Sequence, residues 1–185
     1  MKIETIAWVL PRPRKKQYIK GSFPLHFERR LLELLGFEPG TLGQMEFFDR
    51  SMRTRILHQF GGMAEFGLRM DVNESLEPDL IADAHALPFP DNTFDLVIVD
   101  PPYSDDLSKK IYGTGKLKYY TYVNEAVRVC KPGGFITLYH VVMLPRPKGT
   151  KYHKRIFLGI RIWHRLRCAS IFQKLLPEEV AERGL

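Results

Sequence analysis

The sequence predicts a single α/β domain built on a mostly parallel sheet. The chain has 185 residues, of which 44% are hydrophobic, and this is enough for one core. Leu96–Val99 is a continuous apolar, β-branched run, which is typical of a strand buried on both faces. Apolar residues recur at helical spacing over 119–130, and the following Lys-Pro-Gly-Gly ends that helix. A buried strand followed by a helix favours the α/β class.

The buried strand ends in a group of residues suited to holding an amine. Neither Pro101 nor Pro102 can donate a ladder hydrogen bond, so the strand stops at Asp100. Ligands of open α/β sheets lie beyond the carboxyl ends of the strands. Asp100 can accept one N–H, the Pro101 carbonyl is a second acceptor, and Tyr103 can stack on a flat ring. The alternative is an acidic β-turn without chemistry, because Asp and Pro are common turn residues.

Two flanking stretches favour the chemical interpretation. Residues 83–95 precede the buried strand's end and 125–134 follow it, so three motifs stand in one order between Leu80 and Tyr139. Together they resemble class I S-adenosylmethionine-dependent methyltransferases, and among these the DNA amino-methyltransferases with an Asp-Pro-Pro-Tyr motif. The resemblance implies a Rossmann-like methyltransferase domain over 1–185, S-adenosylmethionine as cofactor, and methyl transfer to adenine N6 or cytosine N4 in DNA. It assigns catalysis to Asp100, Pro101, Pro102 and Tyr103.

The same resemblance implies a cofactor site at successive strand ends. Residues 55–59 are expected to form the first core strand, followed by a glycine turn. Asp71 would end the second strand and bind the ribose hydroxyls, and Asp83 would end the third, near the adenine amine. The implied cofactor-binding residues are Ser22, Phe23, Phe60, Gly61, Gly62, Asp71, Asn73, Asp83, Ala84, His85 and Asp100.

The chain departs from the family pattern between the first two core strands. Only residues 63–66 separate Gly62 from Gly67, whereas a parallel crossover usually needs a dozen or more residues. Either the first crossover helix is shortened or absent, or the first strand lies elsewhere. This departure affects the expected cofactor pocket more than the amine site.

Charge is distributed unevenly along the chain, whose net charge is +7. Residues 5–27 and 145–176 contain no acid, while 71–106 contain ten Asp or Glu and no Lys or Arg. An acidic centre suits a cationic cofactor, and basic ends suit a polyanion, although a solvated basic surface would give the same pattern. The expected partner is nucleic acid, DNA rather than RNA, bound by Arg12, Arg14, Lys15, Lys16, Lys148 and Lys151.

The composition also limits the other classes of protein and site. No apolar run reaches the length of a transmembrane helix, and the first residues do not resemble a signal peptide. Cys130 and Cys168 are far apart and are expected to be structural thiols, which favours the cytoplasm. No histidine stands at metal-ligand spacing from Cys or Glu, so no metal site is expected.

The remaining segments are assigned more coarsely. Residues 3–10 are expected to form a strand or an extended part of a basic N-terminal arm (1–20), and 25–35 a helix. A strand is expected at 135–142, then a basic turn at 145–154, and 156–176 are expected to supply two antiparallel strands at the sheet edge. The polar segment 104–118 would be an active-site loop, and 177–185 a frayed tail.

Two other functions remain open on the sequence. RNA guanine-N2 methyltransferases share the Asp-Pro-Pro-Tyr motif. A methyltransferase-like protein that binds nucleic acid without catalysis is the other alternative, and the short segment between Gly62 and Gly67 is what favours it.

Overall fold

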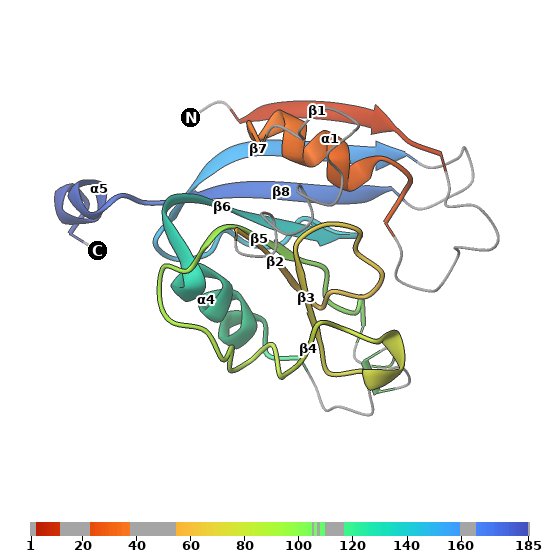
Figure 1. Ribbon diagram of the computed structural model, residues 1–185. Helices are drawn as coiled ribbons and strands as arrows, with labels where there is room; N and C mark the ends of the chain where they lie inside the picture. Colours follow the sequence, from red (N-terminus) through yellow and green to blue (C-terminus); the bar gives the residue numbers. More distant parts are fainter. Residues whose placement is uncertain are drawn as a thin grey trace.

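An eight-stranded sheet organises the protein (Figure 1). The structure is a computed structural model that describes residues 3–11, 23–37, 55–104, 106, 108–109, 117–159 and 166–184. The strand order is β1-β7-β8-β6-β5-β2-β3-β4. The strands are β1 (Glu4–Val9), β2 (Ile56–Gln59), β3 (Leu68–Asp71), β4 (Leu80–Ile81), β5 (Phe94–Val99), β6 (Cys130–His140), β7 (Thr150–Gly159) and β8 (Arg167–Lys174).

Strand direction confirms the expected mostly parallel sheet. All neighbouring strands pair in parallel except β8, which is antiparallel to both β6 and β7. Beyond this antiparallel part, β1 adds one more strand parallel to β7, so the segment expected as a strand or an arm is a strand. Every strand except β8 therefore ends at the same side of the sheet, which we call the carboxyl edge.

Of the described helices, α1 (Phe27–Leu34) and α4 (Tyr119–Val129) cover opposite faces of the sheet (Figure 1). Helix α1 buries Phe27 and Leu31 in a cluster with residues of β2, β5 and β7. On the other face α4 buries Val123 and Ala126 against β5 and β6. Both helices were expected from their apolar spacing, and each fully buried large side chain stabilises the fold by roughly 1.5–3 kcal/mol.

The connection from β2 to β3 contains no helix over residues 60–67, as the short segment predicted. Gly67 permits the tight return, because its φ is +88° and a Cβ there would lie 2.8 Å from the Ile56 carbonyl oxygen. Glu28 of α1 supports the turn by accepting hydrogen bonds from the N–H groups of Glu65 at 3.0 Å and Phe66 at 3.5 Å. Glu28 also lies 3.3 Å from the ring of His58 on β2. An acid from α1 thus satisfies backbone groups that a crossover helix would bond internally.

The last third of the chain differs from the sequence prediction in its boundaries. Strand β6 begins at Cys130, directly after α4, and β7 begins at Thr150, inside the expected basic turn. The basic residues Lys151, Lys154 and Arg155 lie in a run of half-buried positions, and buried residues recur only at Ile156 and Leu158, so the charge pattern did not reveal the strand. The expected tail contains the helix α5 (Pro177–Glu182), which has proline in its first turn and a bond from the Leu176 N–H to Glu179.

Candidate active site

The ends of β2 and β5 form the centre of the candidate site. The two strands are neighbours, but β3 and β4 continue the sheet on one side and β6 on the other. Such a switch point is where open α/β sheets bind ligands. Asp100 directly follows β5, and its N–H donates to the carbonyl of Gln59, the last residue of β2, at 3.3 Å. The topology therefore brings the Asp-Pro-Pro-Tyr segment next to the turn that contains Gly61 and Gly62.

Like the amide of Gln59 beside it, the buried carboxyl group of Asp100 has one oxygen without a hydrogen-bond partner at this point of the described structure. Its Oδ1 is buried and has no hydrogen-bond partner among the described residues. Burial raises the pKa of Asp100 to about 8, although the Tyr103 hydroxyl and the positive charge of Arg167 oppose the rise. Buried polar atoms without partners are rare in proteins, and strongly shifted carboxyl groups gather at functional sites. Pro101 is buried and Pro102 half-buried directly after it.

Tyr103 is held between two side chains that the sequence prediction did not include. The guanidinium carbon of Arg167 lies over its ring, 5.0 Å from the centroid, and His140 meets the ring edge-on at 5.0 Å. Burial, and then the charge of Asp100, raise the pKa of Tyr103. Arg167 thus covers one face of the Tyr103 ring, so a base cannot stack on that face as expected.

His140 and Tyr139 come from the end of β6, and Arg167 from the start of β8. Burial raises the pKa of Tyr139, as does the neighbouring Asp100. Burial lowers the pKa of His140, as does Arg167, and its Nδ1 accepts the Val142 N–H at 3.1 Å. The predicted strand over 135–142 could have indicated His140, because a parallel neighbour of β5 ends at the same edge. Nothing in the sequence places Arg167, since the register of an antiparallel strand is needed to do so.

The glycine turn after β2 is packed tightly against β3. A Cβ on Gly61 would lie 2.9 Å from the Cβ of Arg69, and the Gly61 N–H donates to the Met70 carbonyl at 2.7 Å. Phe60 has a φ of +64° and packs edge-on against Tyr122 at 5.3 Å. The lack of a side chain at Gly61 therefore allows the turn to pack closely against β3. Contact of this turn with a cofactor stays a prediction.

Asp71 ends β3 as expected, but its carboxylate is bonded to the protein itself. The residue is 1% exposed, its Oδ2 accepts the Gly62 N–H at 3.3 Å, and its Oδ1 accepts the Asn73 N–H at 2.9 Å. Burial raises its pKa. Asn73 in turn caps the short helix η2 (Glu74–Leu76) by accepting the Ser75 N–H at 3.1 Å. Asp71 thus ties the glycine turn to the end of β3.

Asp83, Ala84 and His85 form a second turn at the carboxyl edge, after β4. Asp83 Oδ1 accepts from the backbone N–H of His85 at 2.9 Å and from its ring Nδ1 at 2.7 Å. Burial acts to raise the pKa of Asp83, but the bonds from His85 outweigh it and leave the pKa below its usual value. Beneath this turn the buried Gln59 amide donates to the carbonyls of Ala84 at 2.7 Å and Tyr122 at 3.0 Å.

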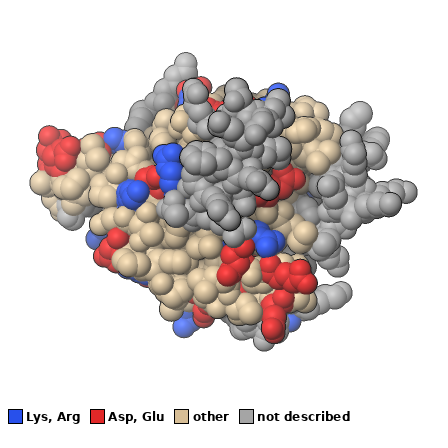
Figure 2. All heavy atoms as spheres, in the orientation of Figure 1, with Lys and Arg blue, Asp and Glu red and all other residues tan. Residues whose placement is uncertain are grey.

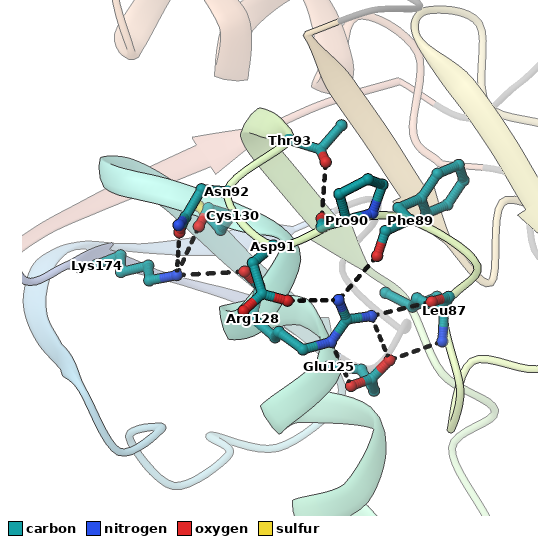
Figure 3. Close-up of polar contacts among 10 residues, drawn as sticks. All are labelled: Leu87, Phe89, Pro90, Asp91, Asn92, Thr93, Glu125, Arg128, Cys130 and Lys174. Atoms are coloured by element: carbon teal, nitrogen blue, oxygen red, sulfur yellow. Dashed lines mark hydrogen bonds and ion pairs between the residues drawn. The ribbon is translucent and has the colours of Figure 1, made fainter.

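One arginine fixes the next part of the same loop to α4 (Figure 3). Arg128 donates to the carbonyls of Leu87 at 2.9 Å and Phe89 at 2.8 Å, and it forms ion pairs with Asp91 and Glu125. Glu125 accepts the Leu87 N–H at 2.7 Å. The segment 83–95, on which the family resemblance partly depends, is therefore held by a structural network that positions the turn at Asp83.

Ser22 and Phe23, two of the implied cofactor-binding residues, precede α1 in the sequence. Ser22 is outside the described residues. Phe23 is 9% exposed and packs against Phe27 and edge-on against Tyr139, with ring centroids 5.1 Å apart in both pairs. Through Tyr139 it reaches the group that we call the Asp100 cluster, which consists of Asp100, Tyr103, Tyr139, His140 and Arg167. Contact of Phe23 with a cofactor remains a prediction.

The predicted nucleic-acid residues do not form one described surface. Arg12, Arg14, Lys15 and Lys16 lie outside the described residues. Lys148 is exposed, and Lys151 forms an ion pair with Glu179 of α5 at 2.5 Å. Both lysines stand at the start of β7, at the opposite end of the strands from Asp100, where Figure 1 also shows α5. Binding of nucleic acid by these residues stays a prediction.

Acidic side chains gather near β4 and η2, as Figure 2 shows. Glu74, Glu77 and Asp83 are exposed there, and Asp79 forms an ion pair with Arg69. Across the described ranges, no three His, Cys, Asp or Glu side chains are grouped as a metal site would require. None of the helices that the structure describes is long and apolar enough to cross a membrane. Cys130 and Cys168 are buried free thiols, as expected.

Comparison with known proteins gives weak matches among solved structures. No family model and no curated protein matches the chain. The N-methyltransferase NodS from Bradyrhizobium japonicum WM9 is 12% identical, with 72% of this chain and 94% of NodS covered and a TM-score of 0.46. A SAM-dependent methyltransferase from Methanosarcina mazei is 14% identical, with coverages of 68% and 94% and a TM-score of 0.46. The PH0226 protein from Pyrococcus horikoshii OT3 is 14% identical, with coverages of 80% and 91% and a TM-score of 0.43. None of these likenesses identifies the chemistry of the site.

Proposed function

We propose that the protein is an S-adenosylmethionine-dependent methyltransferase that methylates an exocyclic amine of a nucleobase, with adenine N6 or cytosine N4 in DNA as preferred targets. The observation that carries the proposal is the buried, unpartnered Oδ1 of Asp100 at the switch point of the sheet. It lies in the Asp-Pro-Pro-Tyr segment, where the family resemblance places the amine. An acceptor that the protein leaves unpaired at a ligand-binding edge suits a ligand N–H.

The residues at the carboxyl edge fit the cofactor in part. Asp83 is exposed after β4 and would accept from the adenine amine, and the acidic surface beside it suits a positively charged sulfonium. Asp71 fits less well, because both of its oxygens already accept backbone N–H groups. We therefore assign the adenine end of the cofactor to Asp83 and His85, and to Asp71 the support of the glycine turn.

The chain's own residues would do three things in the reaction. When bound, the cofactor supplies a methyl group on a positively charged sulfur. Asp100 accepts a hydrogen bond from the amine, which localises the nitrogen lone pair, and the Pro101 carbonyl is a second acceptor. As the nitrogen gained the methyl group and the sulfur released it, Asp100 would take the proton that the nitrogen loses. A pKa of about 8 makes the Asp100 carboxylate a better base than an ordinary aspartate.

A transfer experiment with a deuterated methyl group tests the proposal. Protein, cofactor and DNA or RNA oligonucleotides of all four bases are incubated, digested to nucleosides and weighed by mass spectrometry. The expected product is heavy N6-methyladenine or N4-methylcytosine from DNA, absent with Asp100→Asn. Heavy N2-methylguanine from RNA would instead support the guanine alternative. No labelled nucleoside from either polymer would contradict methylation of nucleobases.

A non-catalytic relative that binds nucleic acid is the second candidate, and the engaged carboxylate of Asp71 favours it. Cofactor binding separates the two functions. A cofactor at a hundred times its dissociation constant stabilises a folded protein by about 2.7 kcal/mol, which raises the melting temperature by several degrees. A rise with S-adenosylmethionine or its demethylated product supports the enzyme, whereas no rise at millimolar ligand favours the second candidate.

A further inference from the structure

We propose that Arg167 and the hydroxyl of Tyr103 form one chain of donors that holds the Asp100 carboxylate for the target amine, so that Tyr103 acts through its hydroxyl as a positioning residue. This inference rests on the proposed function and deepens it. It assigns a role to Arg167, which no sequence motif indicated. It also replaces the expected role of Tyr103 as a stacking surface for the base.

The first step is the position of Arg167. It is the first residue of β8, which pairs with β6, and β6 pairs with β5. Its guanidinium carbon lies 5.0 Å from the centroid of the Tyr103 ring. A cation over an aromatic face is attractive, and the bulk of the guanidinium occupies the space in which a planar base would stack. That face of Tyr103 is therefore not a free platform.

The second step is the direction of the hydrogen bonds. The guanidinium can only donate, so it donates to the Tyr103 hydroxyl oxygen. The hydroxyl proton is then directed to the carboxylate of Asp100. Because Oδ1 of Asp100 has no partner among the described residues, it is the oxygen left for an incoming amine N–H. The arrangement assigns one carboxylate oxygen to the protein and one to the substrate.

The third step is the charge balance around Asp100. The titratable groups that act on it are Tyr103 from its own turn, Tyr139 from the end of β6 and Arg167 from β8, and His140 lies behind them against the Tyr103 ring. Burial lowers the pKa of His140, so Arg167 is the group of this set that stays charged at neutral pH. Burial favours protonation of Asp100, and in this set only Arg167 and the Tyr103 hydroxyl oppose it. A protonated carboxyl group accepts a hydrogen bond from an amine less well than a carboxylate does.

A direct titration of the Asp100 carboxyl group tests the inference without cofactor or substrate. Carbon-13 NMR of aspartate-labelled protein gives the midpoint, and Asp100→Asn identifies the signal. We expect Tyr103→Phe and Arg167→Gln each to raise the midpoint by about one pH unit, the size of effect that a near charge or hydrogen bond exerts on a carboxyl group. Tyr103→Phe removes a single oxygen, so its result decides the matter even if Arg167→Gln fails to fold.

Strand β7, which pairs with β8 on the side away from β6, offers a matched pair of control residues. Arg155 lies over the ring of Tyr152, 5.7 Å from its centroid, and neither residue belongs to the Asp100 cluster. Arg155→Gln and Tyr152→Phe should leave the Asp100 midpoint where it is. An unchanged midpoint in folded Tyr103→Phe would overturn the inference. Methyl transfer is not needed for this result, so a failure of the proposed function would show separately, as a lack of cofactor binding or of labelled product.

In an active enzyme the same inference reverses the expected order of two variants. If Tyr103 acts by stacking, Tyr103→Phe retains activity and Tyr103→Ala does not. If it acts through its hydroxyl, both lose activity to within about threefold of each other, and raising the pH partly restores Tyr103→Phe. A fully active Tyr103→Phe enzyme with an unshifted pH profile would contradict the positioning role.

Discussion

The two turns that meet at the switch point differ in whether their buried carboxyl groups have hydrogen-bond partners. After β5, Asp100 keeps one carboxylate oxygen buried and unpartnered. After β2, by contrast, the short connection has its acids engaged by backbone N–H groups: Glu28 accepts from Glu65 and Phe66, and Asp71 from Gly62 and Asn73. Both regions bury carboxyl groups, and burial raises the pKa of Asp100 and of Glu28 to about 8.

This difference separates a turn arranged for a ligand from one arranged for the fold. A buried carboxyl group that accepts from backbone N–H groups replaces missing secondary structure, as Glu28 does where a crossover helix is absent. A buried carboxylate with a free oxygen costs stability, and such a cost persists at sites where function requires it. We therefore expect substitutions in the two regions to affect different measured quantities.

The largest effect is expected at Asp100. Asp100→Asn should lower the rate of methyl transfer by at least about a hundredfold, which corresponds to roughly 2.7 kcal/mol of transition-state stabilisation. Its midpoint of urea unfolding should not fall, because no partnered bond of Oδ1 is lost. Turnover and urea denaturation of the same preparation measure both quantities. A variant that unfolds more easily while its rate is retained would place Asp100 with the structural acids instead.

The reverse pattern is expected at Glu28. Glu28→Ala should lower the free energy of unfolding by about 2–3 kcal/mol, because two backbone N–H groups in a buried turn lose their acceptor. Glu28→Gln keeps an acceptor oxygen and should lose much less. Urea denaturation of the two variants gives this comparison, and equal losses would argue against the hydrogen bonds as the cause.

Stability should also fall with rising pH. Folded Glu28 and Asp100 hold their protons up to about pH 8, whereas their ordinary pKa values are 4.5 and 3.8. Between these values the unfolded chain binds fewer protons, so stability decreases as pH rises. Buried His58 acts oppositely below its ordinary value of 6.5, since its pKa is lowered to about 4. From 6.5 to about 8 only the carboxyl effect remains, and for the two groups together we expect a loss of roughly 3 kcal/mol by urea denaturation. Asp100→Asn should make this slope shallower, and an identical slope would refute the assignment.

The smallest effect is expected from alanine substitution of two glycines that share a left-handed backbone conformation. Gly36 and Gly67 have φ of +76° and +88°, but a Cβ meets nothing within 4 Å at Gly36 and the Ile56 carbonyl at 2.8 Å at Gly67. Gly36→Ala should cost about 1 kcal/mol from the left-handed backbone alone. Gly67→Ala should cost measurably more in thermal or urea unfolding. Equal costs would mean that the tight return between β2 and β3 accommodates the added methyl group without strain.

Prediction from sequence succeeded where a signal is local. The buried run of β5 and the apolar stripes of α1 and α4 follow from residue spacing, and Asp100 follows from the end of that run. The parallel pairing of β1 with β7 does not follow from residue spacing. Its partners, such as Glu4 and Lys154, are far apart in the sequence, and only the assembled sheet shows which edge strand β1 can join. Strand β7 was partly missed because its lysines suggested a basic turn.

The sequence predicts which residues stand at the strand ends of the site, but not the contacts that each side chain makes there. Asp71, Asp83 and Asp100 stand at the strand ends expected of them, but whether each carboxylate is free depends on neighbours such as Gly62 and His85. Arg167 reaches Tyr103 across two strand pairings, and no spacing in the sequence encodes that contact.

The pH dependence of single-turnover methyl transfer tests most directly whether the unpartnered Asp100 carboxylate receives the amine. The ionised form is the acceptor, and burial places its pKa at about 8. The rate should therefore rise about tenfold per pH unit from about pH 6, level off above about pH 8, and lose this dependence in Asp100→Asn. A wild-type rate that is constant or falls between about pH 6 and about pH 9 would contradict the account.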